Sequence, residues 1–319
     1  VIGMDATAAM YLAAVIIISY TFLGGFSAVC WTDFFQGMLM LGALLIAPIF
    51  ALALIQGGQG AAVTALPETY WNLFTNWKDI LSGLGWGLGY FGMPHIIVRF
   101  MAIKSVKETT AARRIGIGWM IFSLAGAIAT ALVGVAYYQQ NGGELADAET
   151  VFIALGQILF HPFIAGIMLA AILAAIMSTI SSQLIVTSSA LVEDIYKAIF
   201  NKTATDAHYV FVGRLAVLVV SIIAAFLAWN PNNSILDLVG FAWAGFGAAF
   251  GPIILLALYW RKLTNIGALA GMVSGAAVAF IWGKVPSLAS ALYEIVPGFI
   301  VCLLVAVVVS LVTYKPNRE

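Results

Sequence analysis

Long apolar stretches separated by short polar turns dominate the pattern of this sequence. We count nine of them, near residues 6–23, 34–55, 81–101, 115–138, 161–192, 209–229, 235–259, 265–283 and 291–314. Each reaches the length of about 18 apolar residues that is typical of a membrane-spanning helix. Turn signals such as Asn141-Gly142-Gly143 and the Asn- and Pro-rich run 230–233 lie between them. The pattern predicts an all-α polytopic membrane protein with about nine transmembrane helices, in a single membrane domain over residues 1–319.

The composition excludes several other classes of protein. Hydrophobic residues make up 63% of the chain and charged residues only 9%, whereas soluble domains carry about 25% charged residues. Fourteen basic and fourteen acidic residues cancel, so no net charge recruits a nucleic acid. The sequence contains no HExxH motif and no phosphate-binding loop. We therefore expect a protein whose partner is the lipid bilayer, with no nucleic acid bound and no enzyme activity.

Basic residues in or close to the connections predict the orientation in the membrane. They follow the third, fifth, seventh and ninth stretches: Lys104, Lys107, Arg113, Arg114, Lys197, Lys202, Arg214, Arg261, Lys262, Lys315 and Arg318. The opposite side has only Lys78 and Lys284, and an acidic loop with Glu144, Asp147 and Glu149. Because basic loops stay in the cytoplasm, we expect a multi-pass protein of the plasma (inner) membrane with a cytoplasmic C-terminus and an external N-terminus.

The third stretch has an unusual composition for a transmembrane helix. Its sequence GLGWGLGYFGMPHIIVRF, residues 83–100, places five glycines before Pro94. Within a helix each glycine costs about 1 kcal/mol and a proline about 3 kcal/mol. The run predicts a discontinuous helix that exposes backbone groups to a ligand at mid-membrane, and close packing through small residues is the alternative. Trp86 and Tyr90 share a helix face, where they could form an aromatic wall.

The fifth stretch concentrates hydroxyl groups. Ser178, Thr179, Ser181 and Ser182 lie within five residues of an otherwise apolar helix. Such hydroxyls often bond back to a carbonyl one turn earlier, but neutral oxygens at this density also suit a hard cation such as Na⁺. Asp33, at the cytoplasmic entry of the second stretch, is either a solvated edge residue or part of an ion path.

Glycines recur every four residues in the seventh and eighth stretches. The first pair is Gly247 and Gly251, and the second set is Gly267, Gly271 and Gly275. This spacing allows two helix backbones to approach closely in a membrane. We expect close helix contacts at both places.

Five stretches of the chain resemble the sodium/solute symporter family, and most closely its proline transporters. They are residues 20–37, 85–101, 172–198, 241–252 and 293–299, among them the motifs WTDFFQG, GWGLGYFGMP and FAWAGFGAAFGP. The resemblance implies the inverted-repeat (five-plus-five) sodium symporter fold with additional flanking helices. On this basis 1–55 is the tail of the first repeat, 81–259 the second repeat, and 265–314 two flanking helices. Val1 then lies near the fourth core helix, so we expect the fold to be incomplete at the N-terminus.

The resemblance also assigns roles to single residues. It implies substrate binding by Trp86, Tyr90 and Pro94, although Met93 stands where the proline transporters commonly have glutamine. It implies a site for the co-transported Na⁺ at the carbonyl of Ala175 and the hydroxyls of Ser178 and Thr179. Asp33 matches an acid associated in the family with sodium coupling.

A second cation position is a further hypothesis. Helix geometry puts Ser181 and Ser182 about one turn beyond Ser178, towards the side on which the loop charges place Asp33. In the family's two-sodium members an acid pairs with two such serines. The alternative is that Asp33 only eases the exit of sodium to the cytoplasm.

These observations lead to a functional expectation. The chain is expected to serve sodium-coupled secondary active uptake of a small solute, with L-proline as the expected substrate. Symport of another small carboxylate or a vitamin is the alternative within the class. A symporter-like sensor module is the alternative from another class.

Overall fold

A computed structural model of the chain describes residues 6–64, 66–72, 74, 76–143, 145, 147–228 and 235–315. Every regular element among them is helical. In chain order these are α1 (Ala6–Leu52), α2 (Gly58–Thr64), α3 (Glu68–Trp71), α4 (Trp77–Gly89), α5 (Pro94–Met101), α6 (Val106–Asn141), η1 (Ala148–Thr150), α7 (Val151–Leu159), α8 (Pro162–Ser189), the π-helix η2 (Ala190–Phe200), α9 (Asp206–Leu227), α10 (Ile235–Tyr259), α11 (Asn265–Lys284), α12 (Pro286–Ala289) and α13 (Ile295–Thr313). The predicted all-α fold class is confirmed.

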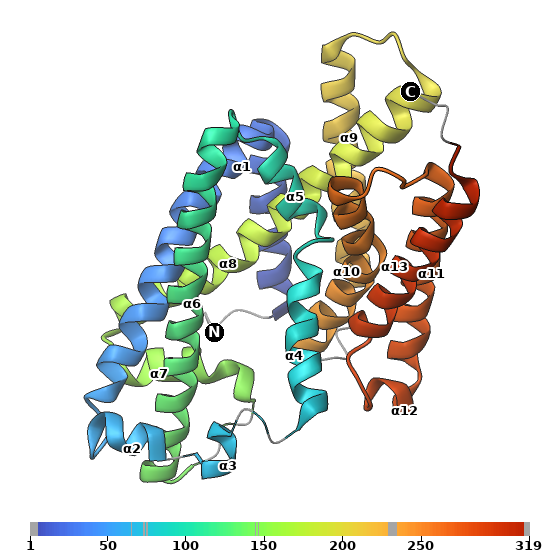
Figure 1. Ribbon diagram of the computed structural model, residues 1–319. Helices are drawn as coiled ribbons and strands as arrows, with labels where there is room; N and C mark the ends of the chain where they lie inside the picture. Colours follow the sequence, from blue (N-terminus) through green and yellow to red (C-terminus); the bar gives the residue numbers. More distant parts are fainter. Residues whose placement is uncertain are drawn as a thin grey trace. The chain divides into compact units, whose positions relative to one another are not determined.

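Seven segments of the described chain are long and apolar enough to cross a membrane: α1, α6, α8 with η2, α9, α10, α11 and α13. The first difference from the nine predicted stretches lies in α1, which runs through the connection expected at 24–33. Two helical limbs, both blue in Figure 1, meet there at Gly25, whose φ of 58° and ψ of −153° suit glycine alone. The limbs correspond to the predicted stretches 6–23 and 34–55. Asp33 is the only charged residue at 24–33, so a solvated loop has little to stabilise it.

The second difference is the predicted third stretch, which forms two short helices. α4 ends at Gly89, and the amides of Phe91 and Gly92 close a tight turn onto the carbonyls of Leu88 and Gly89, at 3.3 and 2.9 Å. Met93 is extended, and Pro94 is the first residue of α5, where its missing N–H costs no hydrogen bond. The predicted discontinuous helix is confirmed.

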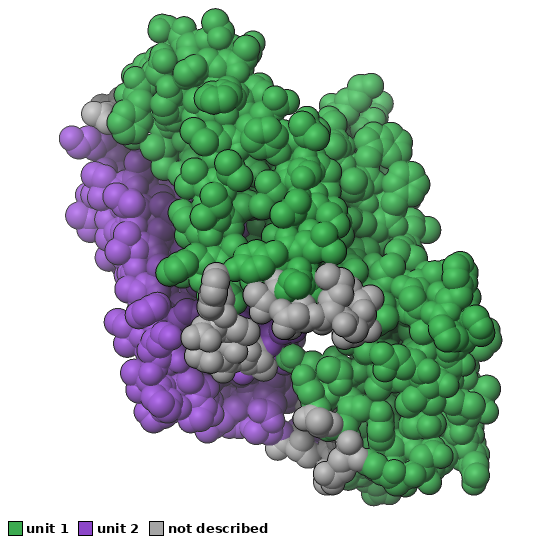
Figure 2. Space-filling view, turned by 180° about the vertical axis from the view of Figure 1, so that it is seen from behind, with its two compact units in different colours: residues 1–70, 104–230 green, residues 71–103, 231–319 purple. Residues whose placement is uncertain are grey.

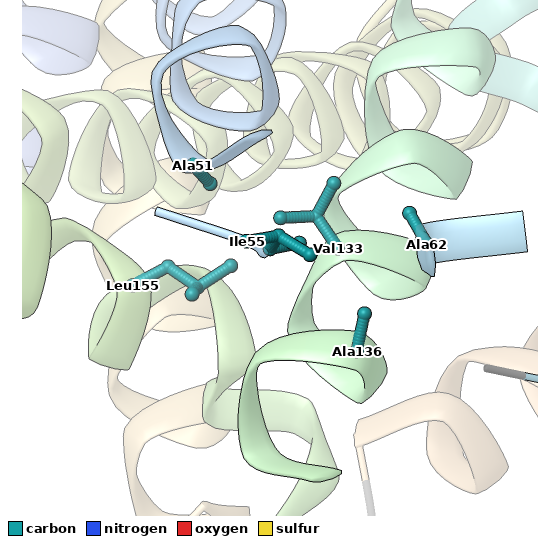
Figure 3. Close-up of a cluster of buried hydrophobic side chains, with 6 residues drawn as sticks. All are labelled: Ala51, Ile55, Ala62, Val133, Ala136 and Leu155. Carbon is teal, nitrogen blue, oxygen red and sulfur yellow. The ribbon is translucent and has the colours of Figure 1, made fainter. Parts of the chain in front are cut away.

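The chain forms two compact units, coloured separately in Figure 2. Unit 1 comprises residues 1–70 and 104–230, and unit 2 comprises residues 71–103 and 231–319. In unit 1, α6 and α8 pack along α1, and α9 packs against α8 and α1. A buried apolar cluster joins the end of α1 to α2, α6 and α7, as Figure 3 shows; it consists of Ala51, Ile55, Ala62, Val133, Ala136 and Leu155. This packing fixes the C-terminal end of α1.

Unit 2 is built on close helix contacts at glycines. α11 packs along α13, and α10 contacts both. A Cβ atom added at Gly275 would lie 2.5 Å from the carbonyl oxygen of Ala248 and 2.6 Å from Cβ of Cys302. One added at Gly247 would lie 2.7 Å from Cα of Gly89, so α10 touches the end of α4 beside the break. The predicted close contacts at these glycines are confirmed.

Some expectations lie beyond what the structure tests. The turn at 230–233, Glu144 and Arg318 fall outside the described residues. The division into a first-repeat tail, a second repeat and two flanking helices stays a prediction.

Candidate functional site

The hydroxyls of α8 are arranged as a ladder along one part of the helix. Ser178 and Thr179 both donate a hydrogen bond to the carbonyl oxygen of Ala175, each at 3.0 Å. One turn further on, Ser181 and Ser182 donate to the carbonyl oxygen of Ser178, at 3.1 and 2.7 Å. Ser181 and Ser182 are buried. The predicted hydroxyl cluster is therefore continuous over two turns of the helix.

This back-bonding leaves the hydroxyl oxygens able to bind a cation. A serine or threonine hydroxyl carries one hydrogen and two lone pairs. In α8 the hydrogens point to backbone carbonyls, so the lone pairs remain as acceptors. The hydrogen-bond pattern is the one expected of a structural helix, and it is also compatible with coordination of a hard cation.

Asp33 lies against the second step of this ladder. The hydroxyl of Ser182 is 3.1 Å from Oδ2 of Asp33, between α8 and α1 of unit 1. The same hydroxyl is 2.7 Å from the carbonyl oxygen of Ser178, and its single hydrogen serves one of the two acceptors at a time. The structure thus brings together three of the residues singled out in the sequence: Asp33, Ser182 and Ser178.

Two further polar residues of α1 belong to this region, and the sequence reasoning missed them. The hydroxyl of Tyr20 donates to the carbonyl oxygen of Met177 at 3.2 Å and also interacts with the side chains of Ser181 and Gln36. Oε1 of Gln36 is buried, with no hydrogen-bond partner in the described part of the chain. Gln36 follows Asp33 by three residues and so shares its helix face. That spacing was the signal available in the sequence.

The aromatic residues expected to bind substrate meet in unit 2. The ring of Trp86 stacks with that of Trp243, at a centroid distance of 5.7 Å, and Tyr90 meets the same Trp243 edge-on at 4.8 Å. Tyr90 is 43% exposed. Pro94 begins α5 on the far side of the break. Trp86 and Tyr90 thus share one aromatic partner, which the sequence reasoning did not identify.

Tyr293, just before α13, also joins this cluster. Its ring stacks with Trp86 at 5.8 Å, and its hydroxyl donates to the carbonyl oxygen of Gly240 at 2.6 Å. Burial, together with the neighbouring carboxylate of Glu294, raises the pKa of the Tyr293 hydroxyl. Burial also raises the pKa of Glu294. The Tyr293 hydroxyl therefore stays protonated at neutral pH and remains a donor to Gly240.

The model of the sodium:solute symporter family matches residues 1–275. The chain belongs to this family. Symporters are transporters, so the expectation that the protein is not an enzyme agrees with its family.

Two relatives are similar over the whole chain. The high-affinity proline transporter PutP of Bacillus subtilis is 54% identical, and the match covers 100% of this chain and 68% of the relative. A sodium/proline symporter of Staphylococcus aureus is 52% identical, over 99% of this chain and 64% of the relative. The chain thus spans about two thirds of the length of these relatives.

A solved structure of another symporter is similar in fold to this chain. A Na⁺-coupled sialic acid symporter, in its substrate-bound outward-open state, matches with a TM-score of 0.78 at 22% identity. The match covers 100% of this chain and 69% of that protein. The symporter fold expected from the sequence is confirmed.

Proposed function

We propose that this chain is part of a sodium-coupled symporter that takes up L-proline. The observation that carries the proposal is the identity of 54% and 52%, along the whole chain, to two proteins named as proline transporters. Sodium entering the cell drives the uptake. One positive charge moving across a potential of about 100 mV supplies about 2.3 kcal/mol, or roughly a 50-fold accumulation.

In this proposal the substrate binds at the break between α4 and α5. Trp86 and Tyr90 offer flat apolar surface, which suits the pyrrolidine ring of proline. α5 begins at Pro94, so the positive end of its helix dipole lies at the break and favours the carboxylate of the substrate. Met93 is buried against the same apolar cluster as Trp243, which adds to the apolar character of this position.

The first sodium site lies at Ala175, Ser178 and Thr179. The carbonyl oxygen of Ala175 accepts both hydroxyl hydrogen bonds. A sodium ion held by this carbonyl replaces those bonds, and the hydroxyls turn their lone pairs to the ion. The contacts between the ion and these oxygens compensate for the two hydrogen bonds, because carbonyl and hydroxyl oxygens are ligands that a hard cation accepts.

The second cation position lies at Asp33, Ser181 and Ser182. A carboxylate inside a membrane bundle is expensive unless it is paired. The contact between Ser182 and Asp33 places a hydroxyl oxygen beside this carboxylate, and a sodium ion bound there carries the opposite charge. If Asp33 only eases sodium exit, the ion visits this position without contributing to the stoichiometry.

The orientation of the chain follows from its basic loops. The positive residues after α5, η2, α10 and α13 lie on the cytoplasmic side. The C-terminus is therefore cytoplasmic, and the chain lies in the plasma membrane.

Uptake of radiolabelled proline tests this function. The complete reading frame that contains this chain is expressed in cells without proline transport, and uptake is measured in sodium, lithium and potassium buffers. We expect accumulation with sodium and little with potassium. Equal uptake in potassium, or no uptake of proline alongside sodium-driven uptake of another carboxylate, would contradict the proposal.

A further inference from the structure

Trp86, which is proposed to line the substrate pocket, is held from two directions within unit 2. Its ring stacks with Trp243 of α10 at 5.7 Å and an interplanar angle of 15°, and with Tyr293 at 5.8 Å and 17°. Near-parallel, offset rings at these separations are mutually attractive. Trp86 is thus part of a three-ring stack contributed by α4, α10 and the segment before α13.

Tyr293 is itself fixed to both neighbouring helices. Its hydroxyl donates to the carbonyl oxygen of Gly240 on α10 at 2.6 Å, and its backbone N–H donates to Oγ of Ser82 on α4 at 3.3 Å. Ser82 precedes Trp86 by one helical turn and lies on the same face. Tyr293 is therefore anchored beside the residue that it stacks on.

The backbones approach closely at this point, which leaves the stack little freedom. A Cβ atom added at Gly85 would lie 2.7 Å from Cγ2 of Val296 and 3.1 Å from Cγ2 of Ile295. These two residues follow Tyr293 and begin α13. The start of α13 is thus packed directly on the glycine that precedes Trp86.

Trp243 makes the corresponding attachment from α10. Its indole N–H donates to the backbone carbonyl oxygen of Trp86 at 2.8 Å. Its ring also contacts the edge of Tyr90 at 4.8 Å and 83°. Gly89, between these residues, has no Cβ and so leaves room for the indole of Trp243.

We propose that Tyr293 and Trp243 are positioning residues, which set the orientation of Trp86 and thereby the affinity for substrate. The inference rests on the proposed function and adds a role for the segment that leads into α13. A glycine-rich helix end has little rigidity of its own. The rings of Tyr293 and Trp243 hold Trp86 in place before substrate binds. Substrate binding therefore has to order this helix end less than it otherwise would.

The alternative is that the stack only joins helices and has no bearing on the substrate. Its loss would then lower the amount of folded protein and leave the KM for proline unchanged. A positioning role instead raises KM and spares the maximal rate per transporter. Measuring KM and the maximal rate separately therefore distinguishes the two roles.

Kinetics of proline uptake by the full-length protein, normalised to the amount in the membrane, provide the test. For Tyr293→Leu we expect a KM about threefold to tenfold higher, the effect of losing one aromatic pair. Tyr293→Phe keeps the ring and should recover most of the affinity.

Trp243→Phe keeps a ring but loses the indole N–H, and its KM should rise about twofold to fivefold. Phe280→Leu is the control, because Phe280 contacts Phe241 and belongs to a different aromatic pair of unit 2.

A double-mutant cycle shows whether Tyr293 acts through Trp86. Once Trp86→Leu has removed the ring on which Tyr293 stacks, adding Tyr293→Leu should raise KM no further. Provided that the parent protein transports proline, two results would overturn the inference. One is an unchanged KM in Tyr293→Leu, and the other is an equal increase in KM when Tyr293→Leu is added to the parent protein and to Trp86→Leu. A parent protein without sodium-dependent proline uptake would overturn the proposed function as well.

Discussion

The hydroxyl of Ser182 on α8 lies 3.1 Å from a carboxylate oxygen of Asp33 on α1, 149 residues earlier in the chain. This contact links the only charged side chain of 24–33 to the ladder of hydroxyls on α8. An acid and a neutral oxygen cluster within one membrane unit form an arrangement typical of ion pathways. The ion chemistry of the protein is therefore expected to depend on Asp33.

Asp33→Asn removes the charge and keeps the shape of the side chain. We expect the sodium concentration for half-maximal proline uptake to rise about tenfold or more, since an opposite charge is lost from a site of low dielectric. Asp79→Asn, in the first turn of α4, is the control and should leave sodium dependence unchanged. A sodium dependence unaffected by Asp33→Asn would remove Asp33 from the ion path.

Thr179→Ala tests the proposed first sodium site. The hydroxyl of Thr179 lies 3.0 Å from the carbonyl oxygen of Ala175, and its loss should raise the half-maximal sodium concentration about fivefold to tenfold. Thr187→Ala, eight residues further along α8 and similarly exposed, is the matched control. Equal effects of the two substitutions would speak against a site at Thr179.

Trp86→Ala and Tyr90→Ala test the proposed substrate site. Each should raise the KM for proline at least about tenfold, because each removes aromatic surface from the break in the helix. Trp77→Ala, at the exposed start of the same helix, serves as the control. Unchanged kinetics in both variants would exclude these residues from the pocket.

Gly275→Ala tests the close packing of unit 2. An added methyl group meets the carbonyl oxygen of Ala248 at 2.5 Å, and overpacking of this kind costs about 1–3 kcal/mol. We expect a lower melting temperature of the purified protein in detergent. Gly118→Ala, where nothing lies within 4 Å of the added atom, should not lower it. Equal melting temperatures of Gly275→Ala and the parent would contradict the packing described for α11.

Much of the candidate site could be predicted from local sequence rules, because each of its main features lies within one continuous stretch of the chain. The glycines and Pro94 predicted the break, and the spacing of Ser178, Thr179, Ser181 and Ser182 predicted the ladder on α8. Both follow from helix geometry and from the limits on glycine and proline in helices. One prediction concerned residues of two different helices. The loop charges placed Asp33 on the side of the membrane towards which Ser181 and Ser182 lie.

The residues that sequence reasoning missed meet their partners over long distances in the chain. Trp243 contacts Trp86 at a separation of 157 residues, and Tyr293 bonds to Gly240 at 53. No periodicity along one helix links such pairs. The kink at Gly25 was missed for a different reason: the connection expected at 24–33 is instead helical, and the direction of the chain changes at the single residue Gly25.

The reversal potential of proline transport tests the central claim, sodium coupling through the sites on α8, most directly. Full-length protein in liposomes is exposed to defined sodium and proline gradients, and the voltage of zero net flux gives the sodium:proline ratio. We predict a potential set by both gradients, with a ratio of two that falls to one in Ser182→Ala. A ratio of one, unchanged by Ser182→Ala, would contradict the second site and leave Asp33 on the exit path. A proline flux insensitive to the sodium gradient would contradict the account as a whole.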